Sequence, residues 1–248
     1  SDLILANDPD ADRLAVAIPA DGGWRMLTGD QVGLILAEVC ATKVKTGNLA
    51  NSIVSADISQ LAKAHNLGYQ QTLTGFKWIS KVPNLVYGYE EALGYCVDPE
   101  FTPDKDGITA ALLIAQLAAE LKSEGSNLSK YLGSLQNKYG HLATSQVSIR
   151  VTDLSVIADA MSNLRKSPPK EFEGRLLDAE DLLLSENPTD ALIVSGDSLK
   201  LIFRPSGTEP KLKCYLQFQA ENSEMAIAGL SRLRDFASGL IDDAQQSA

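Results

Sequence analysis

The spacing of apolar and polar residues divides the chain into two parts of different character. Between residues 29 and 139, apolar runs typical of strands alternate with stretches of helical periodicity. This alternation predicts an α/β/α layer domain with a mostly parallel sheet. The expected strands are residues 52–56, 69–73 and 85–89, and the expected helices are residues 30–43, 59–66, 107–122 and 128–139, with a helical turn after Gly75. Asp30 is expected to cap the first of these helices.

After residue 140 the pattern predicts a second domain of another class. The expected strands are residues 146–151, 191–194, 199–203 and 212–218, and the expected helices are residues 154–165 and 224–241. Strands in succession, with helices before and after them, predict an α+β domain: an antiparallel sheet with helices on one side. We therefore expect three segments: residues 1–27, an α/β domain at 28–139 and an α+β domain at 140–248.

The first apolar run, Leu3 to Ala6, predicts a buried strand of a parallel sheet. Such a strand needs neighbouring strands and covering helices, and no residues precede it that supply them. We interpret the chain as the C-terminal part of a longer protein. A partner chain that covers this strand is the alternative.

Asp8, Asp10 and Asp12 lie at alternate positions in the tight loop that follows this run. Carboxylates gathered at one spot repel each other unless a cation lies between them, and a set of oxygen ligands favours Mg²⁺ or Ca²⁺. An EF-hand loop is excluded, because its sixth and twelfth positions are Arg13 and Pro19 instead of Gly and Glu. The loop is a candidate metal site, and a solvated acidic turn is the alternative.

Two loops of the α/β part carry further candidate ligands at the carboxyl ends of strands, where open α/β sheets bind ligands. Lys77, which opens the helical turn, is a candidate contact for phosphate or sugar, or else a solvated lysine. Glu90 and Glu91 end a strand, and one carboxylate can accept hydrogen bonds from paired sugar hydroxyls. Adjacent residues of an extended segment point opposite ways, so only one of the two faces a given ligand. A surface turn is the alternative.

The stretch from Asp104 to Gly107 precedes the longest predicted helix. Asp106 is expected to cap this helix, because its side chain can accept hydrogen bonds from the first free backbone N–H groups. Lys105 is then free to contact an anion.

Near the C-terminus, the sequence R-P-S-G-T-E-P-K lies between two alternating strands. The glycine lets backbone N–H groups turn inward, the hydroxyls donate hydrogen bonds, and the cations supply charge for an oxyanion. The Walker spacing is absent, and a strand instead of a helix follows. A solvated hairpin loop is the alternative. The candidate phosphate ligands are Arg204, Ser206, Gly207, Thr208 and Lys211.

Composition narrows the class of partner. The net charge of −10 argues against general nucleic-acid binding, which needs an extended basic face. The positive charge that a phosphorylated ligand requires is concentrated in or beside the candidate loops. Cys40, Cys96 and Cys214 lie far apart in apolar contexts and indicate reduced core residues of a cytoplasmic protein. No apolar run approaches the ~20 residues of a membrane span, so we expect no membrane partner.

Four motifs, D-x-D-x-D-R, G-Y-E-E-A-L-G, D-K-D-G and R-P-S-G-T-E-P-K, occur in this order. Together they resemble the α-D-phosphohexomutase superfamily, the phosphoglucomutases and phosphomannomutases. The resemblance covers essentially the whole chain, and T-G-F-K-W with E-E-A-L-G-Y is most similar to the phosphoglucomutase-2 and phosphopentomutase subgroup. It implies the end of domain 2 followed by domains 3 and 4 of a four-domain enzyme.

The resemblance also implies a role for each motif. It implies Mg²⁺ at the three aspartates with Arg13 beside them, and a sugar-hydroxyl contact at Glu90. Ala92 occupies the sugar-binding position where many members carry a serine, which leaves hexose specificity open. Lys77 and Lys105 match positions near the sugar and its phosphate, and residues 204–211 match the loop that binds the non-reacting phosphate. The predicted catalytic residues are Arg13 and Lys77.

The chemistry of the family runs through a phosphorylated serine in a Ser-His-Asn or Thr-Ala-Ser-His type loop, and this chain contains no such motif. The resemblance implies an isomerase that passes a phosphoryl group through a sugar bisphosphate, which serves as intermediate and activator. Its expected partners are a phosphorylated sugar and the N-terminal domains of the same protein. The resemblance leaves open whether the substrate is a glucose, mannose or pentose phosphate. It also leaves open whether the activity is that of a mutase or of a bisphosphate synthase. A non-catalytic phosphosugar- or metal-binding module and a purely structural domain are the alternatives.

Overall fold

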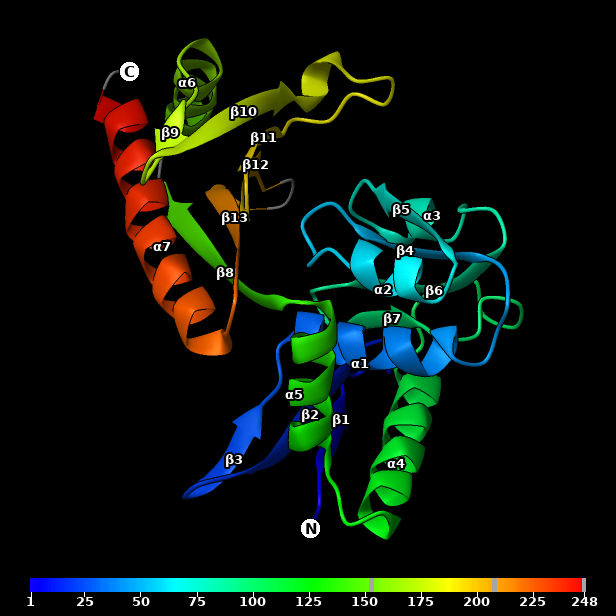
Figure 1. Ribbon diagram of the computed structural model, residues 1–248. Helices are drawn as coiled ribbons and strands as arrows, with labels where there is room; N and C mark the ends of the chain where they lie inside the picture. The colour runs from blue at the N-terminus through cyan, green and yellow to red at the C-terminus, as the bar shows by residue number, and fades with distance from the viewer. Residues whose placement is uncertain (152–153, 207–208, 247–248) are drawn as a thin grey trace. The chain divides into compact units, whose positions relative to one another are not determined.

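The computed structural model describes residues 1–151, 154–206 and 209–246. The chain divides into two compact units, residues 1–139 and residues 140–248 (Figure 1). Each unit has its own core, and each is described separately. None of the helices in the described ranges is both long and apolar enough to cross a membrane.

The first unit begins with a small antiparallel sheet in the order β1-β2-β3. Its strands are β1 (Ile4–Asn7), β2 (Leu14–Ala20) and β3 (Gly23–Met26). The expectation of a buried strand in a parallel sheet at residues 3–6 is wrong, because β1 is antiparallel to β2 and most of its residues are exposed. Along β2, by contrast, the large side chains of Leu14, Val16 and Ile18 alternate and are buried, and the small Ala17 between them is buried as well. One face of this sheet therefore packs on the core, as is usual for an antiparallel sheet.

Helix α1 (Gly29–Ala41) follows, and its cap is Thr28, not Asp30. The Thr28 hydroxyl accepts from the Gln31 backbone N–H, and the Gln31 side chain accepts from the Thr28 N–H, which forms a capping box. Asp30 lies inside the first turn, where its carboxylate accepts from the Ala56 backbone N–H at 2.7 Å. It therefore ties α1 to a loop of the next sheet.

The larger sheet of the first unit has the order β5-β4-β6-β7. Strands β4 (Asn48–Ser52), β5 (Gly68–Thr72) and β6 (Leu85–Glu90) are parallel, and β7 (Gly94–Cys96), which was not predicted, is antiparallel to β6. Strand β4 ends at Ser52, whereas the sequence predicted a strand that begins there and runs to residue 56. Asn51 explains the shift: its buried side chain donates to the carbonyls of Ser52 and Ala56 and holds the chain in a turn there.

Helices cover both faces of this sheet, so the predicted α/β/α layer with a mostly parallel sheet is confirmed. Leu49 and Tyr87 belong to the core cluster that includes α1, whereas Ala50 and Cys96 belong to a cluster with α3 (Phe76–Ile79). The remaining helices are α2 (Ser59–Ala64), α4 (Gly107–Ser123) and α5 (Leu128–Tyr139). Asp106 caps α4 as predicted, since its carboxylate accepts from the N–H groups of Ile108 and Thr109.

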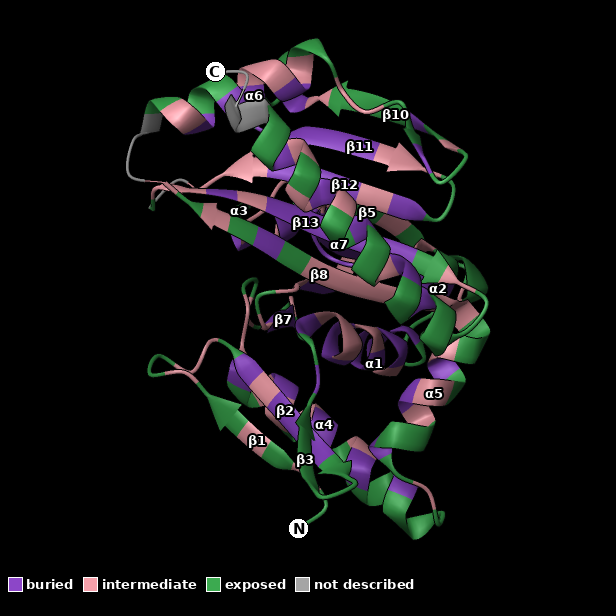
Figure 2. Cartoon of the chain, turned by 90° about the vertical axis from the view of Figure 1, so that its left-hand side faces the viewer, coloured by how far each residue is buried: buried purple, intermediate pink, exposed green. Residues whose placement is uncertain are grey.

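The second unit is a fully antiparallel sheet in the order β8-β13-β12-β11-β10-β9. Its strands are β8 (His141–Arg150), β9 (Glu171–Phe172), β10 (Arg175–Asp181), β11 (Leu192–Gly196), β12 (Leu199–Pro205) and β13 (Lys211–Ala220). Helices α6 (Leu154–Lys166) and α7 (Ser223–Gln246) cover one face, with α7 in front of β13 and β8 in Figure 2. The predicted α+β domain is confirmed.

Strands β9 and β10 and the 3₁₀ turn Leu182–Leu184 were not predicted. The residues of β10 are mostly exposed, with Leu177 as the buried one, so the segment lacks the apolar alternation that marks a strand. The three cysteines are free and buried, as predicted.

Candidate functional site

The loop between β1 and β2 brings the three aspartates together. One carboxylate oxygen each of Asp8, Asp10 and Asp12 lies within 4.8 Å of the others. A turn closed by the Ala11 N–H on the Asp8 carbonyl, with Ala11 in the left-handed region (φ 58°), produces this arrangement. The sequence motif thus forms a cluster of carboxylates in the folded chain.

Two cations partly neutralise the cluster. The Arg13 side chain donates to the Asp8 carboxylate at 2.6 Å, and the Arg13 backbone N–H donates to the same group at 3.1 Å. Desolvation opposes ionisation of Asp8, yet these hydrogen bonds outweigh it and lower the pKa of Asp8 below its ordinary value. The expectation that Lys105 is free for an anion is wrong, because its ammonium group pairs with Asp12. That hydrogen bond raises the pKa of Lys105.

The donor set fits a hard divalent cation. Carboxylate oxygens are the ligands that Mg²⁺ prefers, and it is commonly held by one or two carboxylates together with waters and phosphate oxygens. An ion bound here competes with Lys105 for Asp12. A metal ion that binds Asp12 therefore has to displace the Lys105 ammonium group from it.

Glu90 and Glu91, at the end of β6, take different partners. The Glu90 carboxylate accepts from the Gly75 backbone N–H at 2.6 Å, which joins this loop to the turn that carries Lys77. Glu91 instead accepts from the Ser55 hydroxyl at 2.8 Å. Lys77 is exposed on α3, with its ammonium group 5.7 Å from the centre of the Trp78 ring. Ala92, between the glutamates and β7, is exposed.

Backbone contacts join the aspartate loop, the glutamate loop and the start of α4. The Leu14 N–H donates to the Leu93 carbonyl at 3.0 Å, and the Gly107 N–H donates to the Ala11 carbonyl at 3.1 Å. A Cβ atom at Gly107 would lie 2.4 Å from the carbonyl oxygen of Arg13, so only glycine permits this close approach. Three motifs that are far apart in the sequence thus form one site within the first unit.

The second unit carries the predicted phosphate loop between β12 and β13. Arg204 lies opposite Lys213, and Lys211 lies opposite Arg150 on β8. The sequence did not predict Arg150 and Lys213 as neighbours of the loop. Arg150 is far away in the sequence, and Lys213 lies within the apolar pattern of the predicted strand. The backbone N–H of Ser206 donates to the Lys211 carbonyl at 2.8 Å and closes the loop. Gly207 and Thr208 lie outside the described residues.

Lys211 has an anionic partner inside this loop. Its ammonium group lies 2.9 Å and 3.0 Å from the two carboxylate oxygens of Glu209, and Arg150 donates to the same carboxylate at 3.1 Å. Hydrogen bonding by Lys211 lowers the pKa of Glu209. A phosphate bound in this loop would compete with Glu209 for both cations.

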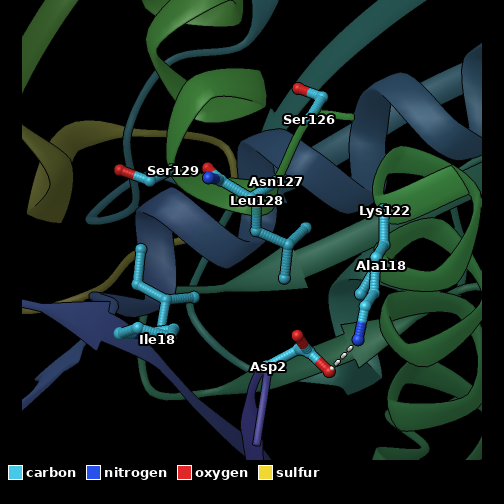
Figure 3. A pocket seen from close by; sticks show the side chains of 9 residues that line it. Asp2, Ile18, Ala118, Lys122, Ser126, Asn127, Leu128 and Ser129 are labelled. Atoms are coloured by element: carbon cyan, nitrogen blue, oxygen red, sulfur yellow. Dashed lines mark hydrogen bonds and ion pairs between the residues drawn. The ribbon is translucent and has the colours of Figure 1, made fainter. Parts of the chain in front are cut away.

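A pocket of about 260 Å³ lies elsewhere in the first unit (Figure 3). Ile18, Ala118 and Leu128 line its apolar part, and Asp2 and Lys122 form an ion pair of 2.9 Å within it. None of the predicted site residues belongs to this pocket. It is a feature separate from the candidate site.

Known proteins share the sequence and the fold of this chain. A family model described as phosphoglucomutase/phosphomannomutase, alpha/beta/alpha domain III, matches residues 28–139. Over 232 residues the chain is 43% identical to a protein of Haemophilus influenzae named "Probable phosphomannomutase", with 91% of this chain and 48% of the relative covered. A phosphoglucomutase of Staphylococcus aureus is 32% identical over 252 residues, with 90% of this chain and 46% of the relative covered.

Solved structures show the same fold. The phosphoglucomutase parafusin of Paramecium, in its open form, superposes with a TM-score of 0.74 at 19% identity, covering 97% of this chain and 45% of that one. A phosphoglucomutase/phosphomannomutase family protein of Burkholderia thailandensis gives a TM-score of 0.67 at 16% identity, covering 100% of this chain and 48% of that one. The chain spans about half the length of the relatives it matches. The motifs, the family model and the curated relatives together place the chain among the phosphoglucomutases and phosphomannomutases, the α-D-phosphohexomutase superfamily.

Proposed function

We propose that the chain is part of a Mg²⁺-dependent phosphosugar mutase and supplies its metal, sugar and phosphate ligands. The observation that carries the proposal is how three segments meet within the first unit: Arg13 of the aspartate loop bridges Gly94, the strand partner of Glu90. Lys105 pairs with Asp12 of the same loop. Charge-neutralising ligands for a phosphoryl group beside acceptors for sugar hydroxyls suit phosphoryl transfer on a sugar.

In this proposal Asp8, Asp10 and Asp12 hold Mg²⁺. The ion, when bound, offsets negative charge on a phosphoryl group in transfer. Arg13 orients Asp8 and contributes positive charge, whereas Lys105 neutralises Asp12 until the ion or a phosphosugar arrives. A structure of Aspergillus fumigatus N-acetylphosphoglucosamine mutase was solved with GlcNAc-6P and magnesium, which supports the same pair of ligands here.

Glu90 is the proposed acceptor for sugar hydroxyls, with the small Ala92 beside it and Lys77 on the adjoining turn. Arg204, Ser206, Gly207, Thr208 and Lys211 are the proposed ligands of the substrate's non-reacting phosphate. Lys211 exchanges Glu209 for the phosphate in this scheme, because a dianionic phosphate attracts the ammonium group more strongly than one carboxylate. The sugar itself, glucose, mannose or a pentose, stays open.

The proposal assigns the phosphoserine to a part of the protein outside this chain. Transfer to and from that serine passes through a sugar bisphosphate, and the Aspergillus enzyme has been solved with glucose 1,6-bisphosphate. We also propose a reducing compartment, the cytoplasm, because Cys40, Cys96 and Cys214 are free and buried.

Calorimetric titration tests this function with the chain itself. Glucose 6-phosphate, mannose 6-phosphate and ribose 5-phosphate are titrated alongside inorganic phosphate, with Glu90→Gln as the comparison variant. We expect Glu90→Gln to weaken at least one sugar phosphate about tenfold, because it replaces a charged acceptor of hydroxyl protons by a neutral one. Inorganic phosphate should bind both proteins equally. The sugar site is refuted if the sugar phosphates bind no better than inorganic phosphate and their affinity is the same for Glu90→Gln as for the unaltered chain.

A further inference from the structure

Glu91, the neighbour of the proposed sugar ligand, is held at two points by a single serine. The Ser55 hydroxyl donates to the Glu91 carboxylate at 2.8 Å, and the same hydroxyl oxygen accepts from the Glu91 backbone N–H at 2.9 Å. Ser55 has no exposed surface and belongs to the loop after β4, 36 residues earlier in the chain. This double contact fixes both the backbone and the side chain of Glu91.

The loop that contains Glu91 has few alternative conformations. Glu90 pairs with Gly94 across β6 and β7, so only residues 91–93 form the connection. Leu93 is in the left-handed region (φ 68°), which a branched side chain enters only under constraint. On the α1 side, a Cβ atom added to Gly29 would lie 1.9 Å from the Glu91 carbonyl oxygen. The first residue of α1 therefore packs directly on the loop backbone.

The electrostatic setting makes the serine contact important. Burial raises the pKa of Glu91 to about 7; the Ser55 hydrogen bond opposes this rise, and the charges of Asp30 and Glu90 add to it. Asp30 faces Glu91 from the first turn of α1 and Glu90 adjoins it on its own strand. The Ser55 hydrogen bond is thus the largest of the contributions that favour the ionised form of Glu91.

We propose that Ser55 and Glu91 are a positioning pair, which holds the loop after β6 so that Glu90 is presented to the hydroxyls of a phosphosugar. The inference rests on the proposed sugar-binding role of Glu90, whose carboxylate is already oriented by the Gly75 N–H. The pair acts through Glu90 and not by contact with the sugar. Loss of the pair therefore weakens sugar recognition and leaves phosphate recognition in the other unit intact.

Variants of both partners test the pair by calorimetry on the whole chain. Ser55→Ala and Glu91→Leu each remove the hydrogen bond between the two side chains. We expect each to lower the affinity for glucose 6-phosphate, or for the sugar phosphate that binds best, about three- to tenfold. Glu91→Gln keeps an acceptor for Ser55 and should stay within about twofold of the unaltered chain. The double variant should bind the sugar phosphate as well as the single variant of lower affinity does, because both single variants break the same contact.

Inorganic phosphate and Tyr87→Phe serve as controls. Tyr87→Phe also removes a buried hydroxyl, one that donates to the Gly33 carbonyl at 3.0 Å, and it should not alter sugar phosphate affinity. The pair is refuted if Ser55→Ala and Glu91→Leu bind like the unaltered chain while Glu90→Gln does not, or if Tyr87→Phe loses as much affinity as they do. If Glu90→Gln itself has no effect, the proposed sugar site fails and the pair fails with it.

Discussion

At the scale of single residues, the candidate metal site is an arrangement of charges that already balance in part. Asp8 pairs with Arg13 and Asp12 pairs with Lys105, so the aspartate loop does not need an ion to keep its carboxylates together. Sequence alone predicted the gathering of carboxylates from their alternate spacing. It did not predict the role of Lys105, because the approach of residues 93 positions apart is decided by the packing of α4 on this loop.

Lys105→Met should therefore tighten Mg²⁺ binding. The substitution removes the cation that competes for Asp12 and makes the site more negative, and we expect a gain of about three- to tenfold at low ionic strength. Mg²⁺ titration of both chains by calorimetry measures it. Weaker binding in Lys105→Met would show instead that Lys105 holds Asp12 in its binding position.

The pKa of Glu91 predicts a pH dependence of stability. Its ordinary value is 4.5 and burial raises it to about 7 in the folded chain. Between these values the folded state holds a proton that the unfolded state has released, so the stabilisation present below about pH 4.5 is lost as the pH rises through 7. Glu91→Gln removes this dependence. Relative to the variant, the unaltered first unit should lose on the order of 2–3 kcal/mol of unfolding free energy between pH 4.5 and pH 8.

Tryptophan fluorescence during denaturant unfolding measures this difference selectively, because both tryptophans, Trp24 and Trp78, belong to residues 1–139. Equal pH profiles for the two proteins would mean that Glu91 keeps its ordinary pKa when folded.

At the scale of secondary structure, elements with a regular apolar pattern were predicted well, whereas boundaries that depend on hydrogen bonds of single side chains were not. Helix α4 and its Asp106 cap were predicted because an acidic residue precedes a long apolar periodicity. The start of α1 was wrongly assigned to Asp30, since both Asp30 and Thr28 are residues that cap helices and only the Gln31 contact separates them. The position of β4 was missed because the turn after it is held by the side chain of Asn51, which no periodicity reveals.

The proposed phosphate ligands all belong to the β12–β13 hairpin, so this hairpin should bind phosphate without the rest of an enzyme. Arg204→Ala should weaken inorganic phosphate about tenfold to a hundredfold, since hydrogen bonds between charged groups contribute ~1.5–3 kcal/mol. Ser206→Ala should have a smaller effect because it removes a neutral donor. Titration of the three proteins measures both effects. Unchanged binding in Arg204→Ala would make this loop a solvated hairpin.

At the scale of the whole molecule, the chain combines two units whose classes were both predicted from the order of apolar runs. What the sequence did not predict is one side of each of the two larger sheets, which is formed by β7 in the first unit and by β9 and β10 in the second. These strands are short or mostly exposed, so they lack a strong apolar pattern. The candidate site was recognisable as four motifs, whereas the contacts between the motifs, such as Lys105 with Asp12, depend on the fold.

The chain by itself should have no mutase turnover. It has no phosphoserine motif, and phosphoryl transfer in the proposed scheme needs that carrier. A coupled assay with glucose 1-phosphate, its 1,6-bisphosphate and Mg²⁺ checks this. Turnover above a control without protein would contradict the assignment of the carrier to another part of the protein.

A crystal structure of the chain grown with Mn²⁺ and glucose 6-phosphate would show the proposed metal site and the proposed phosphosugar site together. We expect an anomalous Mn²⁺ peak within ~2.0–2.3 Å of carboxylate oxygens of Asp8, Asp10 and Asp12, with Lys105 displaced from Asp12. We also expect the phosphate of the ligand against Arg204. A metal bound elsewhere, with the Lys105–Asp12 pair intact and the phosphosugar away from both Glu90 and Arg204, would refute both proposed sites.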